Sequence, residues 1–180
     1  FGLLTQDEIM NFIKAGGPDG KGPRYHELSA DEIQQEVQHF VDAAKRAKAA
    51  NFDAIEIHAG HGYLISSFLS PAVNKRTDEY GGTPEKRAKL LVDIISQIKI
   101  QLKDFPVLVR LDANEYRIEN GITPDDFLIT ASMAQDAGAD AIDVSAYGNT
   151  SKGIAFTEAP LVHEPGGFLN FVKMAKKELT

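Results

Sequence analysis

The sequence contains no cysteine, which excludes disulfides, thiolate metal sites, iron–sulfur clusters and cysteine nucleophiles within these 180 residues. No apolar run approaches the roughly 20 residues that a membrane-spanning helix needs, and no charged-then-apolar signal segment opens the chain. Basic residues are outnumbered, with 19 Lys and Arg against 26 Asp and Glu and a net charge of −7. This acidic balance argues against nucleic acid or an anionic membrane as a partner, because both need a basic face.

The composition is that of an ordinary globular protein, with 43% hydrophobic and 25% charged residues. The length allows one domain with a sizeable core. The chain starts at Phe1 rather than at methionine, and it ends at Thr180 directly after a helical pattern. We therefore expect a piece of a longer protein.

The first 27 residues are the least regular part of the sequence. Thr5 can cap a short helix over Gln6–Ala15. Residues 16–23 then form a turn-rich linker of glycine and proline that neither a helix nor a strand tolerates. We divide the chain accordingly into an irregular lead-in segment, 1–27, and a folded domain, 28–180.

Helices and strands alternate through the rest of the chain. A capping box from Ser29 to Glu32 starts a helix that runs to about residue 50. Threonine–proline pairs at 83–84 and 123–124 start two more helices, because proline is favoured at the first helical position. The second of these closes at Gly138, a candidate left-handed cap. Strands are expected at 53–57, 107–111 and 140–145. A long loop is expected at 58–83, and a final helix at 168–178.

This alternation predicts parallel strands joined by crossover helices. Residues 53–57 and 140–144 are also a weak internal repeat, which suits a (β/α) barrel. A complete barrel needs roughly 250 residues, or 200 at the least, and three strands are fewer than half of eight. The periodicity therefore leaves two interpretations, an internal segment of a barrel or a small open-sheet domain.

Candidate chemistry follows the first expected strand. His58, His61 and Tyr63 stand within six residues, with glycines at 60 and 62 that let the backbone bend. In parallel α/β folds the chemistry lies at the carboxyl ends of the strands. Two imidazoles there can hydrogen-bond a carbonyl oxygen, and a phenol can transfer a proton.

Other interpretations of these residues exist. The histidines could bind a metal ion, but no third ligand has suitable local spacing and no glutamate stands between them. We therefore predict no metal. The histidines could instead be structural and Tyr63 a core aromatic, and Arg110 in the second strand could pair with a loop carboxylate.

Three motifs carry a resemblance to a known family. They are EIHAGHGYL at 56–64, FLSP at 68–71 and NKRTDEYGG at 74–82. Together they resemble the Old Yellow Enzyme family, the FMN-dependent NAD(P)H:flavin oxidoreductases also called ene reductases. The resemblance runs from about residue 27 to the end and is densest over 52–87.

The resemblance implies a TIM (β/α)8 barrel with FMN across its carboxyl-terminal mouth, of which this chain looks like strands four to six with their helices. It implies that His58 and His61 bind the substrate oxygen, although some members have asparagine at the second position. Tyr63 would donate a proton to the substrate α-carbon. Arg110 would lie beside the pyrimidine end of the flavin, where a fixed guanidinium favours the reduced, anionic ring.

The implied reaction passes hydride from NAD(P)H through FMN to an activated C=C bond of an enone or enoate. Two alternatives lie in the same family, NADH oxidase and amine dehydrogenase activity, and a third is a non-catalytic (β/α) ligand-binding domain. The expected partners are a small-molecule substrate and a second copy of the chain in a homo-oligomer, and the expected location is cytoplasmic. An iron–sulfur cluster could exist only outside this segment, as would the residues that bind the FMN phosphate. The 180 residues alone should therefore bind FMN poorly and be unstable unless they associate.

Two further segments are predicted to border the site. The charges of residues 76–82 should pair with one another and fix the long loop. Ser145, Tyr147 and Gly148 fall where the barrel mouth continues, and residues 153–167 could form a substrate lid.

Overall fold

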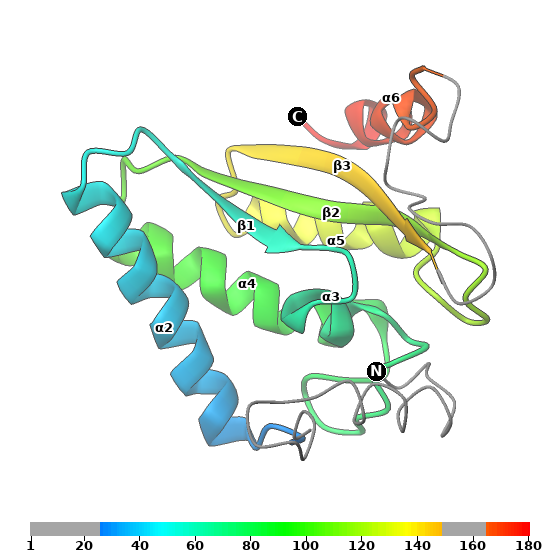
Figure 1. The fold of residues 1–180 in the computed structure, drawn as a ribbon, viewed down its shortest axis with the longest axis horizontal. Coiled ribbons are helices and arrows are strands. Elements are labelled where there is room, and N and C mark those ends of the chain that lie inside the picture. Colours follow the sequence, from blue (N-terminus) through cyan, green and yellow to red (C-terminus); the bar gives the residue numbers. More distant parts are fainter. Residues whose placement is uncertain (1–25, 149–164) are drawn as a thin grey trace, which may run out of the picture.

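The computed structural model describes residues 26–148 and 165–180, which form three strands and five helices (Figure 1). The helix expected at 6–15, the linker at 16–23 and residues 153–164 of the expected lid lie outside the described residues. The described elements, in chain order, are α2 (Ala30–Ala49), β1 (Ile55–Ala59), α3 (Leu64–Leu69), α4 (Pro84–Gln101), β2 (Val107–Tyr116), α5 (Pro124–Asp136), β3 (Ala141–Gly148) and α6 (Leu169–Glu178).

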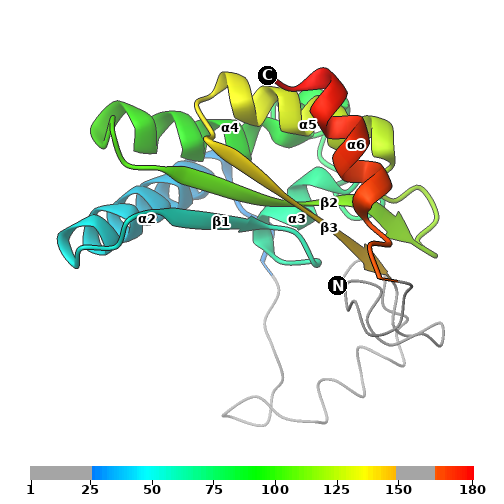
Figure 2. The same ribbon diagram turned by 90° about the horizontal axis from the view of Figure 1, so that it is seen from above.

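The three strands form one parallel sheet in the order β1-β2-β3, as the alternation predicts. Ile57 pairs with Val109, and Val109 pairs with Ile142. Figure 2 shows α4 and α5 along the same side of this sheet. Consecutive parallel strands with helices between them are the repeating unit of a barrel wall.

The helix boundaries follow from local chemistry. Ser29 accepts a hydrogen bond from the Glu32 amide while Glu32 accepts one from Ser29, so the predicted capping box at the start of α2 is confirmed. Thr123 and Asp126 form the same reciprocal arrangement at α5. Gly138 follows α5 with a φ of +106°, which confirms the left-handed cap.

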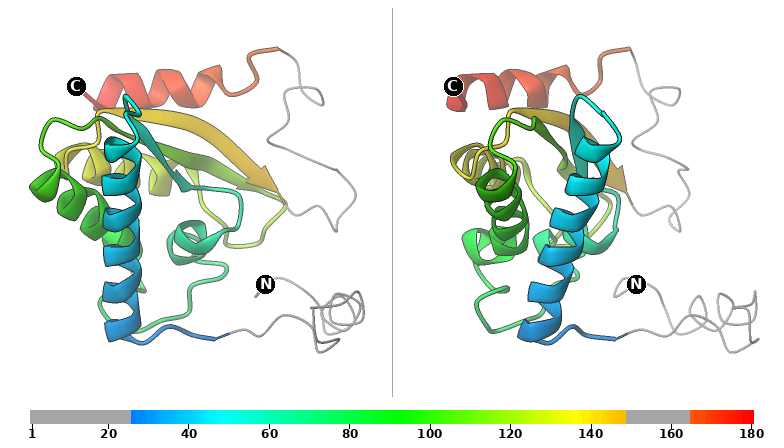
Figure 3. Two further views of the ribbon diagram at one scale, coloured as in Figure 1. Left: turned by 60° about the vertical axis from the view of Figure 1, so that its left-hand side comes forward. Right: turned by 90° about the vertical axis from the view of Figure 1, so that its left-hand side faces the viewer.

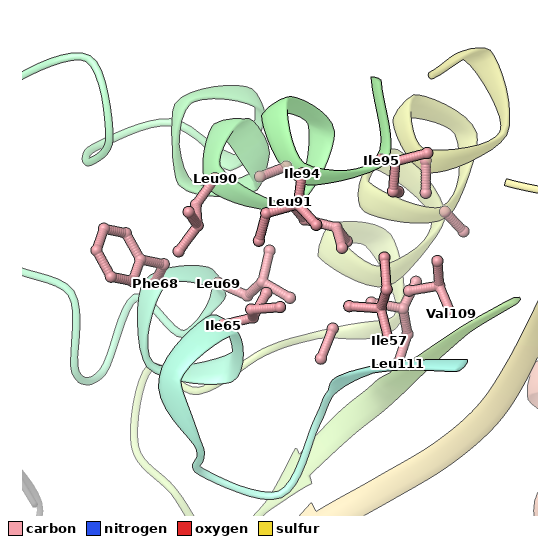
Figure 4. Packing of buried hydrophobic residues seen from close by; sticks show 14 of the residues in the cluster. Ile57, Ile65, Phe68, Leu69, Leu90, Leu91, Ile94, Ile95, Val109 and Leu111 are labelled. Carbon is pink, nitrogen blue, oxygen red and sulfur yellow. The ribbon is translucent and has the colours of Figure 1, made fainter. Parts of the chain in front are cut away.

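The core lies between the sheet and α4. The buried side chains of β1 and β2, among them Ile57, Val109 and Leu111, point toward those of Leu91 and Ile95 (Figure 4). The stripe predicted for this helix is completely buried: Ala88, Leu91, Ile94, Ile95 and Ile98 are each 0% exposed. At about 25 cal/mol per Å² of apolar surface, such burial is the main stabilising contribution to the fold.

The last helix, α6, lies alongside β3 at the edge of the sheet and contacts α5 (Figure 3). Ala175 of this helix is part of the core. Phe171, also in α6, and Leu179, which directly follows it, pack against that core. Among residues 26–148 and 165–180, no helix is long and apolar enough to cross a membrane.

The structure corrects the expected loop at 58–83. It contains the six-residue helix α3, whose first residue follows Tyr63, and Tyr63 makes no side-chain capping bond. Without a cap and with fewer than two turns, this helix gives little local signal. Strand β2 is also longer than expected, because it continues past Leu111 to Tyr116 through an irregularity between Asp112 and Glu115.

Candidate functional site

The face of the sheet opposite α4 carries polar side chains at the carboxyl ends of the strands. Successive strand residues point to opposite faces, so the neighbours of buried Ile57 and Val109 emerge on the other side. His58 pairs in register with Arg110, and Arg110 pairs with Asp143. One row across the sheet therefore brings an imidazole, a guanidinium and a carboxylate together on this open face.

The turn after β1 bends sharply at His61 and Gly62. Both residues have positive φ, 61° and 74°. For a residue with a side chain this conformation costs about 1–2 kcal/mol, so surrounding contacts must hold His61 in place. Gly62 leaves space for Tyr147, because a Cβ at this position would lie 3.3 Å from the Tyr147 hydroxyl.

This turn gathers three of the predicted residues. The rings of His58 and His61 lie 4.9 Å apart, edge to face. The rings of His58 and Tyr63 lie 5.3 Å apart. Tyr63 is 65% exposed, so its side chain is accessible to solvent. Two imidazoles and a phenol therefore lie together at the carboxyl end of β1.

His61 is held from two sides. Its Nε2 lies 2.7 Å from the Ser145 hydroxyl on β3. Its backbone N–H donates to the Asp112 carboxylate at 2.6 Å, and Nε2 lies 3.4 Å from the other oxygen of that carboxylate. The imidazole is consequently fixed by groups from β2 and β3 rather than by its own loop.

His58 has a different environment. Partial burial lowers the pKa of its imidazole below the usual value, and the nearby positive charge of Arg110 lowers it further. A neutral imidazole at neutral pH carries one N–H, which can donate to a ligand oxygen.

Arg110 is the predicted flavin contact, and its guanidinium lies beside two side chains of β3. Its Nη2 lies 3.5 Å from the Ser145 hydroxyl, and its Nε lies 3.4 Å from an oxygen of Asp143. Nε is buried, yet it makes no hydrogen bond within residues 26–148 and 165–180. The guanidinium as a whole is 36% exposed, and its N–H donors suit the carbonyl oxygens and nitrogens of a flavin pyrimidine ring as acceptors. The donor set therefore fits FMN.

The segment 74–82 fixes the long loop beside this turn, as predicted. Arg76 forms an ion pair with Asp78, whose carboxylate also accepts the Tyr80 N–H at 3.0 Å. The Asn74 amide donates to the carbonyls of Phe68 and Tyr80, each at 2.7 Å. These bonds connect α3 to the loop that follows it.

The structure thus places His58, His61, Tyr63 and Arg110 at one end of the sheet. Sequence reasoning missed Asp112, which lies two positions beyond Arg110 along β2 and therefore on the same face of the sheet. The available signal was an acidic residue directly after the apolar run at 107–111. No group of three or more His, Cys, Asp or Glu suited to a metal ion occurs among the described residues.

Comparison with known proteins supports the resemblance. The family model described as "NADH:flavin oxidoreductase / NADH oxidase family" matches residues 14–150. The NADPH dehydrogenase of Bacillus subtilis (strain 168) is 49% identical over 119 residues, which cover 66% of this chain and 35% of that protein. The chain spans about a third of the length of this relative.

Solved structures show the same likeness. A 2-naphthoyl-CoA reductase in complex with 2-naphthoyl-CoA superposes with a TM-score of 0.77 and 32% identity, over 84% of this chain and 23% of that one. The Old Yellow Enzyme homologue of Zymomonas mobilis gives 0.61 and 33%, over 72% and 38%. Histamine dehydrogenase from Rhizobium sp. 4-9 gives 0.63 and 32%, over 67% and 18%.

These matches identify the three-stranded unit as part of a TIM barrel of the Old Yellow Enzyme type, as the motifs predicted. A family model that covers three quarters of the chain, together with the matching fold, leads to one conclusion: the chain belongs to the NADH:flavin oxidoreductase / NADH oxidase family.

Proposed function

We propose that the protein containing this chain is an ene reductase, which passes hydride from NAD(P)H through FMN to the activated C=C bond of an enone or enoate. The observation that carries this proposal is the close approach of His58 to His61 and to Tyr63, beside Arg110. A hydrogen-bonding pair and a proton donor are the two groups that reduction of a polarised alkene requires.

The histidines would bind the carbonyl oxygen of the substrate. When hydride reaches the β-carbon, the electron pair of the C=C bond moves toward this oxygen and leaves negative charge on it. N–H donors that already point at the oxygen stabilise that charge without reorganisation. The lowered pKa of His58 suits a neutral donor rather than a permanent cation.

Tyr63 would supply the proton. As charge returns from the oxygen to the α-carbon, the phenolic O–H protonates that carbon, and the phenolate regains a proton from solvent. Because Tyr63 is 65% exposed, its phenol is accessible both to a substrate and to water. The balance is one hydride from NAD(P)H and one proton from water for each C=C bond reduced.

FMN, when bound, supplies the two-electron carrier between the nicotinamide and the alkene. Arg110 would hold its pyrimidine end through its partly exposed guanidinium. A fixed positive charge at this position lowers the free energy of the anionic reduced ring.

Amine oxidation is the second candidate function. It is favoured by the likeness to histamine dehydrogenase, whose fold covers 67% of this chain. The two candidates differ in the electron donor, which is NAD(P)H for the first and an amine for the second. A cytoplasmic location and a homo-oligomeric state stay predictions from the sequence.

The test uses the full-length protein loaded with FMN under anaerobic conditions. NADH or NADPH should bleach the flavin absorbance, and 2-cyclohexenone should restore it. Bleaching by amines alone would reject the ene-reductase proposal in favour of the second candidate.

Tyr63→Phe isolates the proton donor. We expect reoxidation of the flavin by the enone to slow by about 100-fold, the scale of general acid catalysis, while reduction by NAD(P)H stays nearly unchanged. Tyr80→Phe is the matched control, because this buried phenol bonds Gln34 and Asp93 away from the open face. Equal losses in both half-reactions of Tyr63→Phe would reject the role of Tyr63.

A further inference from the structure

Asp112 is a buried charged group that the proposed chemistry does not use. Its side chain is 0% exposed, although it stands on the sheet face that carries the site. Burial of a carboxylate is unfavourable unless hydrogen bonds compensate for the lost hydration. The contacts of Asp112 therefore indicate its role.

Asp112 contacts the turn after β1. One carboxylate oxygen accepts the His61 N–H at 2.6 Å, and the other lies 3.4 Å from Nε2 of the same residue. The carboxylate also packs against Gly60, where a Cβ would approach it to 2.8 Å. Glycine at position 60 is therefore what allows the carboxylate to reach the amide.

His61 needs such an anchor because its φ of 61° is unfavourable for a residue with a side chain. Hydrogen bonds to an ionised acceptor are stronger and shorter than neutral ones. A carboxylate on a central strand is also a rigid point of attachment, because β2 is paired on both sides.

Ser145 completes the arrangement. Its hydroxyl is buried, lies 2.7 Å from His61 Nε2 and lies 3.5 Å from Arg110 Nη2. The backbone of His61 is thus fixed from β2, and its ring from β3.

We propose that Asp112 is a positioning residue, which anchors the His61 backbone in its left-handed conformation and so aims the second imidazole of the pair at the substrate oxygen. The role in substrate binding rests on the proposed function. The contact between Asp112 and the His61 backbone does not depend on the proposed function, so the anchoring role and the role in substrate binding can be tested separately.

The experiment compares Asp112→Ala with Asp112→Asn in the full-length, FMN-loaded protein. The matched control is Asp140→Ala, because Asp140 also accepts a backbone N–H, that of Val107 at 2.7 Å, but at the amino end of the strands. The first measurement is hydrogen–deuterium exchange of the peptide that contains the His61 amide. The second is the affinity for 4-chlorophenol, followed by the change in flavin absorbance.

Asp112→Ala should speed exchange at the His61 amide by about tenfold and weaken phenol binding by about tenfold, the scale of one lost charge-assisted hydrogen bond, with the FMN content unchanged. Asp112→Asn should recover most of the affinity, because its amide oxygen can accept the same N–H. Asp140→Ala should leave both quantities within about twofold of the wild type.

Three results would overturn the proposal: unchanged exchange in Asp112→Ala, unchanged phenol affinity in that variant, or equal losses in Asp140→Ala. If Asp112→Ala does not accumulate as folded protein, Asp112→Ser replaces it, since the shorter side chain cannot span the same distance, and the same outcomes apply. A wild-type protein that binds no phenol and reduces no enone would reject the proposed function. Exchange at the His61 amide would then still decide whether Asp112 anchors the turn.

Discussion

Glu115 offers a test of how a buried carboxylate fastens the carboxyl end of β2. Its Oε2 accepts both the Ser70 hydroxyl at 2.6 Å and the Ile122 N–H at 2.8 Å. Glutamine keeps an oxygen that can take this position, so Glu115→Gln should change the free energy of unfolding at neutral pH by less than about 1 kcal/mol. Glu115→Ala leaves the buried amide without this acceptor and opens a cavity, which should cost about 2–4 kcal/mol.

The pH dependence gives a sharper criterion. Burial raises the pKa of Glu115 above its ordinary value of 4.5. Protonated Glu115 therefore contributes to the free energy of unfolding. This contribution is fully present below pH 4.5 and is lost as the pH rises through the higher pKa of the folded state. Glutamine does not titrate, so the stability of Glu115→Gln relative to the wild type should improve as the pH rises from 4 toward 7.

Urea denaturation of the full-length protein at several pH values measures this difference. The comparison of variant with wild type cancels the other titrating groups, provided that the slope with urea is unchanged. A difference that stays constant with pH, or that turns against glutamine as the pH rises, would refute the reasoning.

Two more perturbations test the loop that borders the site. A Cβ at Gly81 would lie 2.2 Å from the backbone oxygen of Arg76. A Cβ at Gly82 would meet nothing within 4 Å, so an alanine there would be disfavoured only by the φ of +94°. In denaturation experiments Gly81→Ala should therefore cost about 3 kcal/mol and Gly82→Ala about 1 kcal/mol; equal costs would contradict the packing shown here. Arg87 is buried and donates to the Leu69 and Gly82 carbonyls and to Asp126. Arg87→Met should lower the free energy of unfolding by about 3–5 kcal/mol, and Arg87→Lys should not restore it, because lysine lacks the planar fork; full recovery by lysine would count against this account.

Helices α2, α4 and α5, whose starts the sequence predicted, begin at residues that carry their own hydrogen-bonding partners. The boxes at Ser29 and Thr123 join residues three positions apart, so they depend on nothing distant in the chain. Helix α3 lacks such a cap. Its Ile65, Phe68 and Leu69 are buried at helical spacing, but six residues are too few for a pattern to stand out, and packing against α4 and β1 stabilises the helix.

The candidate site also combines residues that are close in the sequence with residues that only the fold brings together. His58, His61 and Tyr63 are close in sequence, so a bend after one strand suffices to bring them together. Arg110 reaches them only because β2 pairs in parallel with β1 and sets it opposite His58. Asp112 was not predicted, because an acidic residue after an apolar run shows its role only when the neighbouring turn is folded over it.

The amino-acid sequence by itself determined the alternation of helices and strands, the start of each capped helix and the motifs of the family, because these depend on neighbours a few positions apart. Only the tertiary structure decided which side chains share the open face and what holds His61 in its conformation. The physical reason is that the register of β1, β2 and β3 depends on the core packed beneath them, and every helix and strand within residues 26–148 and 165–180 contributes to that core.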